Sequence, residues 1–287
     1  MKTWLLVGIF LVVILGLGAF FSYYYNNPGI LTIAIIFSVV MNITSFWFSD
    51  KIAISMARAV PADTARYAEL HRIVENLSIT AGLPKPKVYI IPDNAPNAFA
   101  TGRNAAHASV AVTEGLLRTL EKNELEGVVA HELAHIGNRD ILLQSVVAIM
   151  VGFIAILADM FTRSLLWGGG GHNSRDNKGS NVLMIVGIVF IVLSPIIATL
   201  IQLAISRKRE YLADATGALL TRYPDGLANA LKKISSYSAP MIHASNATAH
   251  MYISNPFGAS ARTGLKHLFM THPPVEKRIK ALNEMSI

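Results

Sequence analysis

Cysteine is absent from this chain of 287 residues. Disulfide bonds and thiol catalysis are therefore excluded, although the absence says little about the compartment. Charged residues are also scarce: they make up 15% of the chain, whereas a soluble domain usually has about 25%. Hydrophobic residues reach 52%, and the mean hydropathy is +0.43. This composition indicates a protein that lies in a membrane.

Four apolar segments are long enough to cross a bilayer. The first has too long an apolar core for a signal peptide and no small-x-small cleavage site before Tyr23, so we interpret it as an uncleaved anchor. The third carries Asp159 and Arg163 near its outer end, where such a pair can be hydrated. The four predicted spans are residues 4–23, 30–48, 141–167 and 182–205.

Basic residues gather at one end of these spans. Lys2, Lys51, Arg58 and the cluster 207–209 lie at that end, whereas the connection 23–29 has no charge. The positive-inside rule therefore places both termini and the long segment after the second span in the cytoplasm. This bias explains the formal net charge of +7. No DNA- or RNA-binding module is recognisable, so we predict no nucleic-acid partner.

The segment between the second and third spans combines helical and strand patterns. Apolar residues at helical spacing predict a helix over 64–81, and a short helix is predicted over 113–120. Asn123 is predicted to cap the next helix, with Glu126 reaching back from its N3 position. Strands are predicted at 87–91, 97–101 and 107–112, the last two joined as a hairpin through Gly102, Arg103 and Asn104.

Two histidines in the next helical segment have the spacing of a metal site. Residues 131–135 read His-Glu-Leu-Ala-His, and the i,i+4 spacing puts His131 and His135 on one helix face. Two imidazoles so placed can bind one zinc ion, and Glu132 can take a proton from the attacking water. The pattern therefore predicts the catalytic machinery of a zinc peptidase.

A catalytic zinc ion needs a third protein ligand. Glu210 is our candidate, because it follows the fourth span and shares a helix face with Asp214, four residues later. In that arrangement Asp214 would accept a hydrogen bond from the free ring nitrogen of a ligand histidine. The alternative is a solvated Glu210 that forms ion pairs with the basic cluster 207–209. Spacing alone favours neither interpretation.

Several motifs follow one another along the chain after the two N-terminal spans. They are Asn97-Ala98-Phe99-Ala100, the histidine motif 131–135, Asn138-Arg139-Asp140, the segment 209–214, and Thr271-His272-Pro273-Pro274 with Arg278. In this order they resemble the HtpX-type heat-shock membrane metalloproteases, which share a broad family with the CAAX prenyl endopeptidases. The resemblance covers nearly the whole chain. It implies one Zn²⁺ bound by His131, His135 and Glu210, with Glu132 as general base and Asp214 supporting a ligand histidine.

The predicted fold class is a mostly α integral membrane protein with four transmembrane helices. A cytoplasmic, zincin-like α+β protease domain with a small β-hairpin or sheet accompanies them. We expect four parts: two N-terminal transmembrane helices, the first protease segment with the zinc helix, a transmembrane hairpin, and a helical second protease segment with a polar loop at about 236–262. These parts are residues 1–49, 50–140, 141–205 and 206–287.

His272 is the predicted second catalytic residue. Zinc peptidases of this type commonly have a donor opposite the metal that stabilises the tetrahedral oxyanion. The resemblance makes His272 that donor, with Arg278 in the segment that follows. The alternative is that His272 and Pro273 only start the last helix, since proline favours a helix's first turn.

Asn97, Ala98, Phe99 and Ala100 are predicted to form an edge strand over the cleft. An extended substrate could pair with such a strand through main-chain hydrogen bonds, which would give broad specificity. The alternative is an ordinary buried hairpin without a substrate role.

The ligands are predicted to lie near the cytoplasmic surface of the bilayer. His135 is close before the third span and Glu210 close after the fourth. If both helices continue into the spans, each ligand lies within roughly 10 Å of a membrane end. Gly137 and Asn138 offer the alternative, in which the zinc helix ends and the chain turns before the third span.

The predicted protein is a membrane zinc endopeptidase that cleaves misfolded or damaged membrane proteins, or unfolded polypeptides, at the cytoplasmic face of a bacterial plasma membrane. A processing protease of the CAAX type and a non-catalytic, zinc-stabilised membrane scaffold are the alternatives. A transporter would need more paired charges within its spans. The intact Glu132 argues against the scaffold, because a structural site needs no base. The sequence predicts no oligomeric state.

Overall fold

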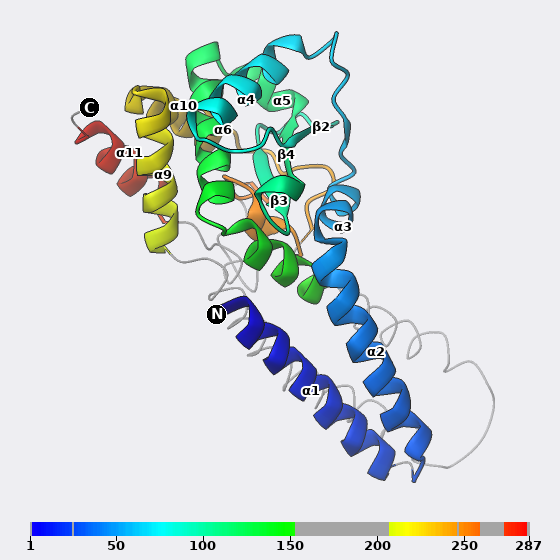
Figure 1. Ribbon diagram of the computed structural model, residues 1–287. Helices are drawn as coiled ribbons and strands as arrows, with labels where there is room; N and C mark the ends of the chain where they lie inside the picture. The colour runs from blue at the N-terminus through cyan, green and yellow to red at the C-terminus, as the bar shows by residue number, and fades with distance from the viewer. Residues whose placement is uncertain (1, 25, 153–206, 246, 259–272, 286–287) are drawn as a thin grey trace, which may run out of the picture.

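The computed structural model describes residues 2–24, 26–152, 207–245, 247–258 and 273–285. Within these ranges the protein is mostly helical, with one small mixed sheet. Two long helices project from the rest of the molecule as a hairpin, and the sheet with its helices forms the other end (Figure 1).

The projecting hairpin consists of α1 (Lys2–Tyr24) and α2 (Pro28–Trp47). Asn27 caps α2 by accepting a hydrogen bond from Gly29 N (2.9 Å), and Pro28 occupies the first helical turn. In the described part of the chain, α2 is the one helix long and apolar enough to cross a membrane, and shorter apolar helical segments are Ile14–Tyr23, within α1, and Ile141–Gly152. The predicted span 182–205, the later part of span 141–167, and both Asp159 and Arg163 lie outside the described residues.

The sheet has four strands in the order β1-β2-β4-β3. Strands β2 and β4 pair in parallel and the other neighbours are antiparallel. The predicted hairpin is confirmed, with both strands shifted by one residue toward the C-terminus, and its connection contains the 3₁₀ turn η1 (Ala105–His107). The strands are β1 (Val60–Pro61), β2 (Lys87–Ile91), β3 (Ala98–Gly102) and β4 (Ala108–Thr113).

The helices between α2 and the end of the histidine motif are α3 (Ser49–Met56), α4 (Ala68–Thr80), α5 (Glu114–Thr119) and α6 (Lys122–Gly137). Helix α4 begins later than predicted, because Asp63 Oδ1 accepts hydrogen bonds from Ala65 N and Arg66 N and holds residues 64–67 as a turn.

The start of α6 differs from the prediction at its cap. A capping box is present, but it is formed by Glu121 and Glu124, not by Asn123 and Glu126. The Glu121 amide donates to Glu124 Oε2 (2.8 Å), and Lys233 from α10 (Pro224–Ser236) donates to the same oxygen (2.7 Å). The salt bridge to Lys233 therefore stabilises the cap at Glu121, two residues before the predicted cap.

The end of α6 corrects the expectation of a continuous helix into the third span. Asp140 N donates to His135 O (3.0 Å) and Arg139 N donates to Ile136 O (3.2 Å), which is the bond pattern of a Schellman turn. Arg139 has φ +60° and so occupies the left-handed position at which glycine is usual. The chain turns here, and a new helix, Ile141–Gly152, begins.

Arg139→Gly is expected to raise the free energy of unfolding by up to about 1 kcal/mol. A left-handed backbone costs an L-residue roughly 1–2 kcal/mol, and the greater freedom of glycine in the unfolded chain offsets part of the gain. Thermal unfolding of the purified full-length protein measures the change. The matched control is Asn138→Gly, because Asn138 has φ −76° and ordinary helical backbone. An equal rise in both variants would contradict the assignment.

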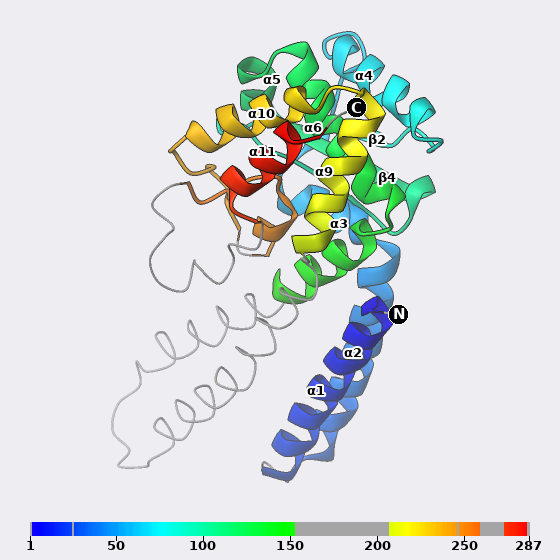
Figure 2. The same cartoon turned by 90° about the vertical axis from the view of Figure 1, so that its left-hand side faces the viewer.

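The described part of the chain after residue 206 contributes α9 (Arg207–Thr221), α10 (Pro224–Ser236), η2 (Ala249–Met251) and α11 (Val275–Asn283). Figure 2 shows α9, α10 and α11 gathered beside α6. Two glycines allow backbones to approach closely. A Cβ atom at Gly217 of α9 would lie 3.0 Å from His131 N, and one at Gly127 of α6 would lie 2.6 Å from Leu227 N of α10. Gly217 therefore brings α9 against the turn of α6 that carries His131.

Candidate metal centre and active site

The metal centre starts from α6, whose buried face carries both predicted histidines. His131 and His135 lie one turn apart, and their Nε2 atoms are separated by 3.2 Å. Glu132 lies between them in sequence and is 2% exposed. All three side chains are buried, so the polar groups of α6 are directed into the protein and not into solvent.

Helix α9 brings the predicted third ligand to these histidines. Glu210 Oε1 lies 3.6 Å from His135 Nε2, and Glu210 Oε2 lies 3.9 Å from His131 Nε2. One ligand atom from each of the three residues falls within 4.8 Å of the others. The alternative of a solvated Glu210 is wrong, because the residue is 1% exposed.

The donor set fits a cation. His131 Nδ1 lies 2.9 Å from Asp214 Oδ1 and His135 Nδ1 lies 3.3 Å from Asp140 Oδ2, so each carboxylate favours the proton on the Nδ1 atom that faces it. Both Nε2 lone pairs then converge with the Glu210 carboxylate, an arrangement that only a positive charge between them stabilises. Two nitrogens bound to one tetrahedral zinc ion lie about 3.3 Å apart, which matches the observed separation. His131, His135 and Glu210 would hold the ion.

The pKa values of the two histidines also indicate that the site favours a positive charge. Burial opposes a charge on His135, but the carboxylates of Asp140, Glu210 and Glu132 raise its pKa to about 9. Burial lowers the pKa of His131 to about 4, even though Asp214 acts in the opposite direction. The carboxylates around His135 therefore favour positive charge at the site, which a bound metal ion would supply.

Asp214 and Arg278 form a buried support beneath His131. Arg278 Nε donates to Asp214 Oδ2 (2.8 Å) and Arg278 Nη2 donates to Oδ1 (2.7 Å), a bidentate pair. Burial alone would raise the pKa of Asp214, but Arg278 and then His131 lower it to about 2. Arg278 Nη1 also lies 3.9 Å from Glu210 Oε2. The C-terminal helix α11 therefore reaches two residues of the site through one side chain.

Glu132 has the position and the acidity that a general base requires. Burial raises its pKa to about 7, and the Glu210 charge adds to the rise, while His135 and a hydrogen bond from the Ala100 amide act against it. A pKa near the operating pH is the condition under which proton transfer is most efficient. The bond from Ala100 also fixes the carboxylate beside strand β3.

Strand β3 is the edge strand that the sequence predicts. Thr113 N donates to Asn97 O (3.0 Å), so alternation along the ladder turns the main-chain groups of Ala98 and Ala100 away from β4. Part of this outer edge is already used: Ala98 O accepts from Ile253 N (2.9 Å), and the Ala100 amide reaches Glu132. Phe99 faces inward and packs edge-on against Tyr252, with ring centroids 5.1 Å apart.

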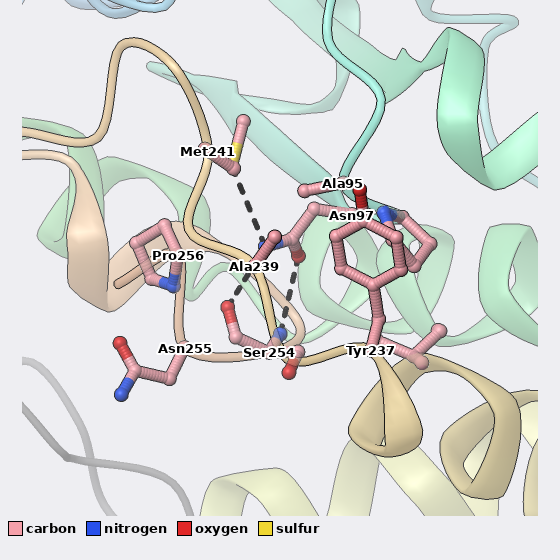
Figure 3. Close-up of a pocket in the computed structure, with 10 residues that line it drawn as sticks. Ala95, Asn97, Tyr237, Ala239, Met241, Ser254, Asn255 and Pro256 are labelled. Atoms are coloured by element: carbon pink, nitrogen blue, oxygen red, sulfur yellow. Dashed lines mark hydrogen bonds between the residues drawn. The ribbon is translucent and has the colours of Figure 1, made fainter. Parts of the chain in front are cut away.

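Asn97 connects β3 to the segment after η2. Its Nδ2 donates to Ser254 O (2.9 Å) and its Oδ1 accepts from Ser254 N (3.2 Å), so the amide side chain pairs with that backbone as a neighbouring strand would. Figure 3 shows the Asn97 amide directed at Ser254 and Met241 beside a small pocket that Tyr237 and Pro256 also line. A substrate role for residues 97–100 stays a prediction.

Two supporting residues were not assigned roles from the sequence. Asp140 and Arg278 lie in the quoted motifs, but only the fold shows that each contacts the site. The sequence contained a weak signal for Asp140: a turn at the C-terminal end of α6 brings the residue five positions after His135 back toward His135. Arg278 lies far from its partners in sequence. His272 lies outside the described residues, and its catalytic role stays a prediction.

Glu210→Gln is expected to weaken zinc binding more than Asp214→Asn does. The first change removes the charge of a direct donor, whereas the second disturbs the orientation of His131 and costs about 10- to 100-fold. Competitive zinc titration of the two purified variants measures the order. Parent-like affinity in Glu210→Gln would mean that another residue is the third donor.

A glutamate placed between two metal-binding histidines, next to a third donor on a neighbouring helix, is the arrangement of a zinc metallopeptidase. The family model described as "Peptidase family M48" matches residues 64–286. The chain belongs to this family.

Individual relatives are more specific than the family model. The chain is 50% identical to a "Protease HtpX homolog" of Caldanaerobacter subterraneus subsp. tengcongensis, an alignment that covers 100% of this chain and 95% of the relative. It is 47% identical to a "Protease HtpX homolog" of Pyrococcus furiosus, over 99% and 96% of the two chains. The crystal structure of S. mikatae Ste24p is similar in fold, with a TM-score of 0.51 and 18% identity. That match covers 96% of this chain and 62% of the length of Ste24p.

Proposed function

We propose that this zinc metallopeptidase is an endopeptidase of a bacterial plasma membrane that cleaves misfolded or damaged membrane proteins at the cytoplasmic surface. The observation that carries the proposal is the contact between the hairpin of β3 and β4 and the end of α2, the helix long enough to cross a membrane. Arg103, which follows β3, lies with its guanidinium 4.5 Å from the centroid of the Trp47 ring at the end of α2.

This contact supports a position of the hairpin near the bilayer surface. Trp47 is 55% exposed and closes α2, a position typical of the aromatic residues at a membrane surface. Lys51 lies 5.5 Å from the Phe48 ring in the same place, which adds positive charge at this end. Strand β3 contacts Glu132 through Ala100 at its middle, and the residue after its end, Arg103, contacts Trp47, so the strand could receive polypeptide segments that leave the bilayer.

Peptide hydrolysis at this site would follow from the residues in place. Zinc, when bound, supplies Lewis-acid polarisation of the scissile carbonyl. Glu132 removes a proton from the attacking water as the C–O bond forms, and then delivers it to the amine nitrogen as the C–N bond breaks. Asp214 holds the His131 ring throughout, and main-chain pairing along β3 would orient the substrate without reading its side chains.

The test compares substrate classes on full-length protein in bilayer nanodiscs, with zinc restored after chelation. We expect cleavage of unfolded casein and of a destabilised membrane protein in the same nanodisc, and little cleavage of the stable parent of that membrane protein. A prenylated peptide with a C-terminal CAAX sequence tests the processing alternative. If only that peptide is cleaved, the protein is a specific processing protease and the quality-control proposal is wrong. Zinc binding without cleavage of any of them would favour the scaffold.

A further inference from the structure

Asp140 lies where three elements meet: the end of α6, the start of the helix Ile141–Gly152, and the start of α9. Its Oδ2 atom lies 3.3 Å from His135 Nδ1, and its Oδ1 atom lies 2.9 Å from Arg209 Nη1. Asp140 is 4% exposed. A carboxylate so buried is costly unless both its oxygens have partners, which here come from two different helices.

We propose that Asp140 and Arg209 are positioning residues of the metal site. Asp140 holds the His135 ring with Nδ1–H toward its carboxylate and Nε2 toward the metal. Arg209 binds the other oxygen of Asp140 and is followed at once by Glu210. The ion pair thereby fixes the first turn of α9 against the end of α6, at the point where Glu210 must face both histidines.

The arrangement repeats on the other histidine. His131 Nδ1 faces Asp214, which Arg278 binds through two hydrogen bonds. Each histidine therefore has a carboxylate on Nδ1, and each carboxylate has an arginine from a different segment. The contacts around His135 are weaker than those around His131. The distance from Nδ1 to the carboxylate is 3.3 Å for His135 and 2.9 Å for His131, and the Arg209 side chain is 25% exposed. Loss of the Asp140–Arg209 ion pair should therefore weaken metal binding without unfolding the protein.

A simpler role for Asp140 is helix capping. Gln144 N donates to Asp140 O (3.2 Å), so Asp140 precedes the first turn of the helix Ile141–Gly152. Asparagine caps helices about as well as aspartate, but it lacks the charge that holds Arg209 and favours Nδ1–H on His135. Asp140→Asn therefore separates the two roles: a cap alone would survive the change.

The experiment measures metal binding directly on detergent-purified, full-length protein. We expect Asp140→Asn to weaken zinc in competitive titration by about 10- to 100-fold. It should also alter the visible absorption spectrum of bound Co²⁺, because the orientation of one imidazole changes. Parent-like zinc affinity together with a parent-like cobalt spectrum would overturn the proposal. Hydrogen exchange of α6 and α9 shows whether the fold is intact, so loss of zinc with global unfolding would also count against it.

A double-mutant cycle tests the pair. Arg209→Gln should weaken zinc as well, and Asp140→Asn combined with Arg209→Gln should cost less than the sum of the single changes, because they break the same ion pair. Arg207→Gln is the matched control: it removes the same charge from an exposed residue on the same turn of α9 and should leave zinc affinity unchanged. Additive effects of the two single changes would show that Arg209 acts without Asp140. These readouts need no substrate, so they hold whichever proteolytic role the site serves.

Discussion

Glu132→Gln is expected to lower peptide cleavage by about 100- to 10,000-fold while one zinc ion per chain remains bound. The substitution keeps the size of the side chain and its hydrogen bond from Ala100, but it removes the group that accepts the water proton. Zinc is retained because His131, His135 and Glu210, the three grouped donors, are untouched. Steady-state cleavage of unfolded casein, together with metal analysis of the same sample, measures both outcomes.

The matched control for this variant is Glu126→Gln. Glu126 lies on the same helix, and its ion pair with Lys122 is long (3.9 Å) and partly exposed, so its loss should leave cleavage near the parent level. Near-parent turnover of Glu132→Gln with full zinc would remove Glu132 from the catalytic role.

Arg278→Met is expected to lower the free energy of unfolding by about 3–5 kcal/mol and to weaken zinc binding. Removing one partner of a buried pair leaves the other as an uncompensated charge, here Asp214. Arg278 is 1% exposed and Asp214 is 3% exposed, so water cannot replace the lost hydrogen bonds. Arg278→Lys should not restore the parent, because a lysine cannot make the bidentate contact. Chemical unfolding followed by fluorescence gives the stability.

The control is again on the same helix. Lys280 pairs with Glu284 at 3.7 Å with both side chains largely exposed, so Lys280→Gln should have almost no effect on stability. Arg278→Met should also cost much less in an Asp214→Leu background, since no buried charge is then left alone. An equal cost in both backgrounds would assign Arg278 a role in packing instead of in charge compensation.

Sequence patterns predicted the local parts of this fold well, because those parts depend on residues close together in the chain. Strand β2 has the predicted bounds, and the hairpin of β3 and β4 follows its turn signal. The helix with His131 and His135 follows from spacing alone. Resemblance was needed to choose Glu210, since its spacing suited a solvated side chain equally well, and only the fold shows it buried.

Contacts between distant segments could not be predicted in the same way. The bond between Arg278 and Asp214 depends on how α11 packs on α9. The ion pair of Asp140 with Arg209 depends on the turn at the end of α6, in which Arg139 has left-handed backbone. The cap of α6 was predicted at the wrong residue because asparagine is a strong general cap, whereas Lys233 from α10 favours the Glu121–Glu124 pair.

The order of the ligands along the chain determines when the enzyme can first act. His131 and His135 precede residues 141–205, while Glu210, Asp214 and Arg278 follow them. A ribosome that adds about 5–20 residues per second needs on the order of 10 s to pass from His135 to Glu210. During this time the nascent chain has the histidines and the general base without the third ligand. Proteolytic competence therefore arises only after residues 141–205 and Glu210 have been synthesised.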